Sequence, residues 1–222
     1  MTPERETAHF AQGTGRPWLD LTLALSAIFI SIISLIVAVR HGAAMDRLVA
    51  ANSWPFLTYG TSNQDVKGDP RILLQVENAG VGPARIETFE VWWGDQPIAS
   101  SLDLLRHCCM SDPGVQIDRA TARAMRLSVG VIAPSVLRAG DAQTFLGLER
   151  TDANAEIWNR LDTARIKIRM RACYCSVFDE CWESDLVETN TKEVKVCPVP
   201  KVPFHLSESW FSSSAEAPAP SN

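Results

Sequence analysis

The sequence predicts a mainly β protein, in which a single amino-terminal transmembrane helix precedes an antiparallel β-sandwich with two short helical inserts and disulfide bonds. Three observations lead to this prediction. An uncharged stretch near the amino terminus is long enough to cross a membrane, later segments alternate apolar and polar residues between turn residues, and all six cysteines lie past position 107. The chain average of 46% hydrophobic and 21% charged residues hides this division, because it is typical of one ordinary soluble domain.

Residues 21–39 (LTLALSAIFISIISLIVAV) contain no charged residue, proline or glycine. At about 1.5 Å per residue they cover about 28 Å, close to the hydrocarbon thickness of a bilayer, so we expect a transmembrane helix over residues 18–40. A cleaved signal peptide is the alternative, but its apolar core is normally about 7–15 residues long. The run here is longer and ends at Arg40 and His41, which favours an uncleaved signal anchor, although the small residues 42–44 leave a cleavage site open.

The orientation in the membrane is not decided by basic residues, because Arg5 and Arg16 precede the helix while Arg40 and Arg47 follow it. The cysteines decide it, since an even, clustered set is typical of a disulfide framework in an oxidising compartment. We therefore expect a single-pass protein of the cell inner membrane. Residues 1–17 would be a short cytoplasmic tail, and the carboxy-terminal domain would be periplasmic.

The expected partners follow from small residues and from charge. Five small residues recur in the helix at steps of three and four, a spacing that lets two membrane helices pack, although such residues are also simply common there. They are Ala24, Ala27, Ser31, Ser34 and Ala38. The whole net charge of −5 falls on residues 41–222, because three basic and three acidic residues cancel over residues 1–40. The expected partners are thus the lipid bilayer and another membrane protein or a second copy, whereas nucleic acid is excluded.

Beyond the membrane segment we expect a helical stalk over residues 41–53, which Pro55 ends, and a sandwich over residues 54–198. Period-two alternation predicts strands, and helical spacing predicts two short helices. The strands are at residues 71–78, 84–93, 127–131, 144–148 and 164–175, with a hairpin that returns through residues 181–182, and the helices are at 100–109 and 152–161. Residues 199–222 are rich in Pro, Ser and Ala, so we expect a disordered tail, in which Trp210 and Phe211 form an apolar pair.

Two turn motifs support a resemblance. The run 76–84 (VENAGVGPA), followed much later by 137–145 (LRAGDAQTF), resembles the pattern of bacterial immunoglobulin-like adhesion modules. The whole chain also resembles uncharacterised bacterial single-pass inner-membrane proteins with such an outer domain. The resemblance implies an immunoglobulin-like sandwich, and the cysteine-rich hairpin and helical inserts depart from the simple module.

The cysteines are the strongest chemical feature: Cys108, Cys109, Cys173, Cys175, Cys181 and Cys197. Cys173 and Cys175 share the outward face of a predicted strand. A bond between the neighbours at 108–109 would be strained, so we expect each to reach a different partner, tying their helix over the strand of Cys173, and the hairpin to be stapled through Cys181 or Cys197. The alternative is a thiolate metal site, but paired C-x-x-C spacing is absent, so no metal or cofactor is expected.

Trp92 points away from its apolar neighbours on the predicted strand, so it lies either beneath helix 100–109 or on an outer surface, where it would be a partner contact. His107 is the only histidine expected within the folded domain, and no nucleophile motif accompanies it, so no catalytic residue is expected. The acidic group at Asp179, Glu180, Glu183 and Asp185 is interpreted as the solvated rim of a turn rather than a cation site.

The expected function is a non-enzymatic, membrane-anchored periplasmic interaction module, an accessory or scaffold subunit of an inner-membrane complex. The alternative is a periplasmic ligand- or metal-binding sensor domain that acts through a partner.

Overall fold

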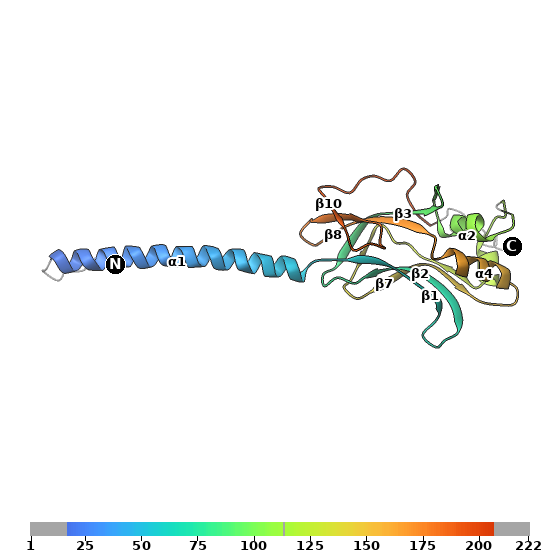
Figure 1. Ribbon diagram of the computed structural model, residues 1–222, viewed down its shortest axis with the longest axis horizontal. Coiled ribbons are helices and arrows are strands. Elements are labelled where there is room, and N and C mark those ends of the chain that lie inside the picture. Colours follow the sequence, from blue (N-terminus) through green and yellow to red (C-terminus); the bar gives the residue numbers. More distant parts are fainter. Residues whose placement is uncertain (1–16, 113, 207–222) are drawn as a thin grey trace, which may run out of the picture. The chain divides into compact units, whose positions relative to one another are not determined.

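The computed structural model describes residues 17–112 and 114–206, and it divides the chain into two units, Met1–Val49 and Ala50–Asn222 (Figure 1). The helices are α1 (Pro17–Asn52), α2 (Ser101–Cys109), α3 (Arg119–Ala124) and α4 (Ala155–Ala164). The strands are β1 (Leu57–Gln64), β2 (Pro70–Asn78), β3 (Ala84–Trp93), β4 (Gln96–Ile98), β5 (Leu127–Val129), β6 (Ser135–Leu137), β7 (Ala142–Glu149), β8 (Arg169–Cys175), β9 (Cys181–Ser184) and β10 (Lys192–Val194).

The expected amino-terminal apolar helix is confirmed. α1 is a continuous helix of 36 residues, in which none is buried, and it begins at Pro17, whose ring suits the first turn. It is long and apolar enough to cross a membrane, as an anchor or a signal sequence would be. The helix runs without a break from the apolar stretch through the expected stalk.

The five small residues of α1 are all exposed in the single chain. Within this stripe the Ser31 hydroxyl donates a hydrogen bond to the Ala27 carbonyl oxygen at 2.8 Å. The hydroxyl is therefore satisfied inside its own helix and leaves a small, smooth surface. Packing of this surface against another helix stays a prediction.

Two antiparallel sheets form the second unit. One has the order β1-β2-β7-β5, and the other has the order β10-β9-β8-β3-β4, with β6 pairing with β3 as well. Every second residue of β2, from Ile72 to Val76, is buried, and β3 shows the same alternation on either side of an irregularity between Ile86 and Thr88. In β8 the residues 172–175 are all buried. The two sheets share one apolar core, in which the Phe89 ring of β3 lies 5.5 Å from the Phe145 ring of β7.

The two turn motifs come together around one buried side chain. The Asn78 amide nitrogen donates to the carbonyl oxygens of Gly82 and Leu137, at 2.8 and 3.1 Å, and its amide oxygen accepts from the Phe56 and Gly80 backbone nitrogens. The polypeptide that enters the domain, the β2–β3 loop and the β6–β7 loop are thereby joined. A Cβ atom at Gly82 would lie 2.0 Å from the Ser53 carbonyl oxygen, so this close approach requires glycine.

The segment after β10 is folded onto the domain, and we call residues 195–206 the strap. Phe204 is 4% exposed, and its ring lies 5.4 Å from that of Phe89 and 5.6 Å from that of Phe145. The Phe204 backbone nitrogen donates to the Phe89 carbonyl oxygen, on the stretch of the β3 edge between the residues that pair with β6 and those that pair with β4. The strap therefore fills a gap at the edge of the sheet and completes the core.

The expectation of a disordered tail from residue 199 is wrong for residues 199–206, because the strap supplies a core side chain. Residues 207–222, with the pair Trp210 and Phe211, lie outside the described residues. The predicted strand start at residue 164 is also wrong. Helix α4 continues to Ala164, β8 begins at Arg169, and Ile166 is 72% exposed.

Candidate functional site

The six cysteines form three disulfides, Cys108–Cys109, Cys173–Cys197 and Cys175–Cys181. The expected staple of the hairpin is confirmed, because Cys175 and Cys181 are paired partners in the β8–β9 ladder. Cys173 lies two residues earlier on the same face of β8 and binds Cys197 of the strap. The outer face of β8 is thus the place where hairpin and strap are both fastened to the larger sheet.

The expectation that Cys108 and Cys109 reach different partners is wrong, because they are bonded to each other. The physical reason is the position of α2. This helix follows β4, which pairs with Val91–Trp93, whereas Cys175 pairs with Arg85 near the other end of β3. A helix at one end of the strand cannot lie over cysteines that pair near the other end.

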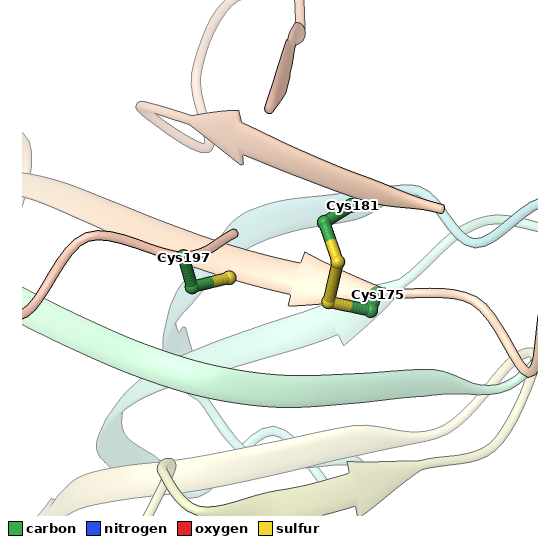
Figure 2. Close-up of side chains that lie close together, drawn as sticks. All are labelled: Cys175, Cys181 and Cys197. Carbon is green, nitrogen blue, oxygen red and sulfur yellow. A yellow bond between two sulfur atoms is a disulfide. The ribbon is translucent and has the colours of Figure 1, made fainter. Parts of the chain in front are cut away.

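Three sulfur atoms gather beside the hairpin. The Sγ atoms of Cys175, Cys181 and Cys197 all lie within 4.8 Å of one another. Figure 2 shows the Cys197 sulfur directed toward the bond that joins the other two. Cys173, Cys175 and Cys181 are buried although they lie on the outward face, where Cys173 is bonded to Cys197 of the strap. The sequence pattern placed two of these cysteines on one face but contained no signal for the return of Cys197.

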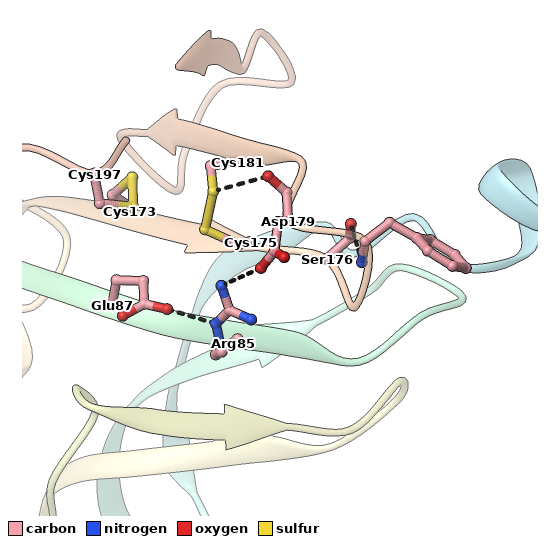
Figure 3. The surroundings of a disulfide bond; sticks show 9 residues. Arg85, Glu87, Cys173, Cys175, Ser176, Asp179, Cys181 and Cys197 are labelled. Carbon is pink, nitrogen blue, oxygen red and sulfur yellow. Dashed lines mark hydrogen bonds and ion pairs between the residues drawn. A yellow bond between two sulfur atoms is a disulfide. The ribbon is translucent and has the colours of Figure 1, made fainter. Parts of the chain in front are cut away.

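Charged side chains surround the sulfur cluster. The Arg85 guanidinium pairs with Glu87 at 2.5 Å and with Asp179 of the hairpin turn at 2.8 Å, as Figure 3 shows. The hydrogen bond to Asp179, which has the larger effect, and the hydrogen bond to Glu87 raise the pKa of Arg85 above its ordinary value. A hollow of about 360 Å³ lies against the cluster, lined by these residues, by three of the cysteines and by Lys195. The sulfur atoms therefore adjoin an accessible, charged cavity.

The acidic residues of the hairpin region contact different partners. Asp179 pairs with Arg85, Glu183 pairs with Arg171 at 3.2 Å, and the Asp185 carboxylate accepts two backbone hydrogen bonds of its own turn. These carboxylates act in local ion pairs and a turn, and their contacts lead to different residues rather than to one point.

Trp92 lies on the outer face of β3, and the segment beside it is the strap rather than α2. The Arg171 guanidinium carbon is 5.4 Å from the centroid of the indole ring, close enough for a cation–π contact. One hollow of about 310 Å³ lies between Trp92 and strap residues 198–202. A second, of about 500 Å³, adjoins Trp92, Arg169 and Val187. Trp92 therefore stands between two hollows, with arginine side chains beside it.

Burial changes the pKa of one carboxylate of this surface, that of Glu90. Glu90 precedes Trp92 by two residues and lines the same hollow under the strap. Partial burial raises the pKa of Glu90, the Arg171 charge opposes this rise, and the Glu183 charge adds to it.

His107 lies on α2 and contacts Asp103 and Gln96. Its Nδ1 atom is 2.9 Å from the Asp103 carbonyl oxygen, and its Nε2 atom is 2.7 Å from the Gln96 amide nitrogen. The Gln96 amide thus stands where a Ser-His-Asp triad would require a hydroxyl. This side of the domain also has a hollow of about 420 Å³, missed by the sequence analysis, lined by Trp93, Cys108 and the cations Arg160 and Lys167 among others.

No family model matches the chain, and no curated protein matches it. The fold and the cysteine cluster define its class in physical terms: an apolar amino-terminal helix followed by antiparallel sheets joined by disulfides.

Proposed function

We propose that this chain is a non-enzymatic, membrane-anchored interaction module, an accessory or scaffold subunit of an inner-membrane complex. One observation supports it above the others: α1, which is long and apolar enough to cross a membrane, and three disulfides occur in the same chain. Disulfides persist in oxidising compartments, which supports a domain on the periplasmic side and an uncleaved anchor with a cytoplasmic amino-terminal tail.

The domain is proposed to be an immunoglobulin-like sandwich. In such domains strands A, B, E and D form one sheet, and C, F and G form the other. The order β1-β2-β7-β5 follows the first pattern, and the order β4-β3-β8-β9 follows the second with an added C′ strand. The disulfides depart from the usual bond between strands B and F, because β2 contains no cysteine.

The proposed partner surface is the outer face of the larger sheet around Trp92. Tryptophan and arginine are the residues that most often dominate binding energy at protein interfaces. Here Trp92 lies between two hollows and is stacked with Arg171, while Arg169 pairs with the exposed Asp95. In the membrane, the stripe of small residues on α1 supports packing against a partner helix or a second copy.

Site-specific photocross-linking tests this surface. A photoreactive amino acid at Trp92 is expected to form one discrete cross-linked product in intact cells, whose second component is an inner-membrane protein identified by mass spectrometry. Val66, fully exposed in the β1–β2 turn, is the matched control position and is expected to form no such product. Equal product at both positions, or none at Trp92, would contradict the proposal.

The topology has its own test. After reduction of intact cells, a membrane-impermeant thiol reagent is expected to label Cys197. A cysteine introduced at Thr7, in a chain whose natural cysteines are replaced by serine, is expected to react only after lysis. Labelling of Cys197 only after lysis would contradict a periplasmic domain.

A periplasmic sensor that acts through a partner is the second candidate, and the hollow beside Cys108 favours it. Trp93 offers an aromatic wall there, and Lys167 offers a positive charge for a small anionic ligand. Isothermal titration of the purified chain with small carboxylates and sugars tests this role, and Lys167→Ala is expected to abolish any carboxylate binding.

A further inference from the structure

We propose that Cys173, Cys175, Cys181 and Cys197 form, in the reduced protein, a thiolate site that binds one zinc ion. This inference does not rest on the proposed interaction role. It rests on the convergence of hairpin, strand and strap, and it assigns a second, alternative state to the residues that form the two disulfides of β8.

The distances fit a zinc ion. Tetrahedral zinc binds thiolate sulfur at about 2.3 Å, which places the sulfur atoms about 3.8 Å from one another. The Sγ atoms of Cys175, Cys181 and Cys197 already lie within 4.8 Å of one another. The fourth sulfur, that of Cys173, is bonded to the Cys197 sulfur in the oxidised protein. Once the two bonds open, the cysteine side chains rotate to bring their sulfurs around one ion, with Cys173 joining the three sulfurs that already lie together.

The backbone holds the four positions independently of the disulfides. Cys175 faces Cys181 across the β8–β9 ladder, and Cys173 lies on the same face of β8. Cys197 is held from the other side, because Phe204 anchors the strap in the core seven residues later. Ligands on two paired strands and an anchored segment give a nearly preformed site, which strengthens metal binding.

Two cations lie near the sulfurs. Four thiolates around Zn²⁺ have a net charge of −2, which is stabilised by nearby cations. Arg85 and Lys195 line the hollow of about 360 Å³ that adjoins the sulfur atoms, and the carboxylates of Glu87 and Asp179, which pair with Arg85, line it too. The same hollow adjoins the buried cluster, so it is the route by which an ion from solvent reaches the sulfurs once the disulfides open.

The chemistry balances with a dithiol of the thioredoxin class as reductant. Two dithiol molecules supply four electrons and four protons, which convert the two disulfides to four thiols and leave two oxidised dithiols. Zinc binding then releases the four protons, because the ligands are thiolates. Disulfides and metal exclude each other, and each joins the strap to β8.

Cobalt substitution tests the site in the full-length chain. The detergent-solubilised protein, reduced with a phosphine and freed of oxygen and metal, is titrated with Co²⁺ and then with Zn²⁺. The expected result is one Co²⁺ per chain, with thiolate-to-cobalt charge-transfer absorption and the visible bands of tetrahedral Co²⁺, both removed by one equivalent of Zn²⁺. The oxidised protein is expected to show neither band.

Two matched variants locate the site. Cys197→Ser is expected to weaken Co²⁺ binding by more than about tenfold, because it removes one ligand. The double variant Cys108→Ser with Cys109→Ser keeps the four proposed ligands and is expected to bind as the natural chain does. Near-ultraviolet circular dichroism follows folding throughout, and Zn²⁺ is expected to restore the folded signal if reduction weakens it.

Three results would overturn the proposal. The first is a reduced chain that stays folded but shows no tetrahedral cobalt bands. The second is that the double variant of Cys108 and Cys109 loses these bands while Cys197→Ser retains them. The third is a chain that unfolds on reduction and that Zn²⁺ does not refold.

Discussion

The side-chain amide of Asn78 donates a hydrogen bond to the carbonyl oxygen of Leu137, 59 residues further along the chain. Backbone bonds reinforce this connection, since Gly140 donates to the Asn78 carbonyl oxygen and the Asn78 nitrogen donates to Asp141. Asn78 therefore joins the β2–β3 loop, which belongs to the first turn motif, to the β6–β7 loop, which belongs to the second.

Replacing Asn78 with alanine is expected to lower the free energy of unfolding by about 2–4 kcal/mol, because four buried or partly buried backbone groups lose their partner. Asn78→Asp is expected to destabilise at least as much, since a carboxylate would face the Gly82 and Leu137 carbonyl oxygens. Urea unfolding followed by tryptophan fluorescence measures both. Asn159→Ala, on the exposed side of α4, is the control and should change stability by less than about 0.5 kcal/mol.

Phe204→Ala is expected to destabilise the domain by about 3–5 kcal/mol, because it removes a buried ring that contacts Phe89 and Phe145. Val199→Ala changes another apolar side chain of the strap, one that is 91% exposed, and should have almost no effect. The thermal unfolding midpoints of the two variants measure the difference. Equal midpoints would show that the strap does not contribute to the core in solution.

The raised pKa of Tyr59 predicts that the domain loses stability at high pH. Burial raises the pKa of Tyr59 to about 12 from 10.0, and its hydroxyl donates to the Arg165 carbonyl oxygen at 3.0 Å. The unfolded chain ionises this tyrosine first, so its contribution is complete below pH 10 and is lost as the pH rises toward 12. Tyr59→Phe should be less stable by about 1 kcal/mol at pH 8 and should equal or exceed the natural chain near pH 12. A constant difference across this pH range would contradict the assignment to Tyr59.

The small-residue stripe predicts contact between helices in the membrane. Ala27→Leu with Ser31→Leu should reduce chemical cross-linking of the full chain in membranes several-fold, because bulky side chains separate the backbones. Phe29→Leu with Ile36→Leu changes the opposite face of α1 and should leave cross-linking unchanged. If both double variants reduced cross-linking equally, the stripe would not be the packing surface.

Local patterns predicted part of this fold. The alternation of residues 84–93 located β3 with its bounds as observed, and Ser100, the N-cap of α2, begins the predicted helix 100–109. Both elements bury one face strongly, so composition and periodicity agree. In contrast, β1 was not predicted, because its sequence LTYGTSNQ is polar and half-buried and lacks a clear apolar period.

The cysteine pairing and the strap depend on long-range geometry and could not be predicted in this way. The pattern placed Cys173 and Cys175 together on β8, but the pairing with Cys197 depends on the path of a segment rich in proline and valine that has no periodicity. Trp92 shows the same limit, since the segment beside it is the strap rather than α2.

The position of Phe204 also constrains the order of events when the domain is made. A nascent chain synthesised only as far as residue 198 contains every strand of both sheets, yet it lacks the ring that contacts both Phe89 and Phe145. Final closure of the core therefore requires delivery of the strap as far as Phe204. Cys197 is delivered almost as late, so oxidation with Cys173 before that moment is impossible, whereas Cys175 and Cys181 are free to join as soon as the hairpin has formed.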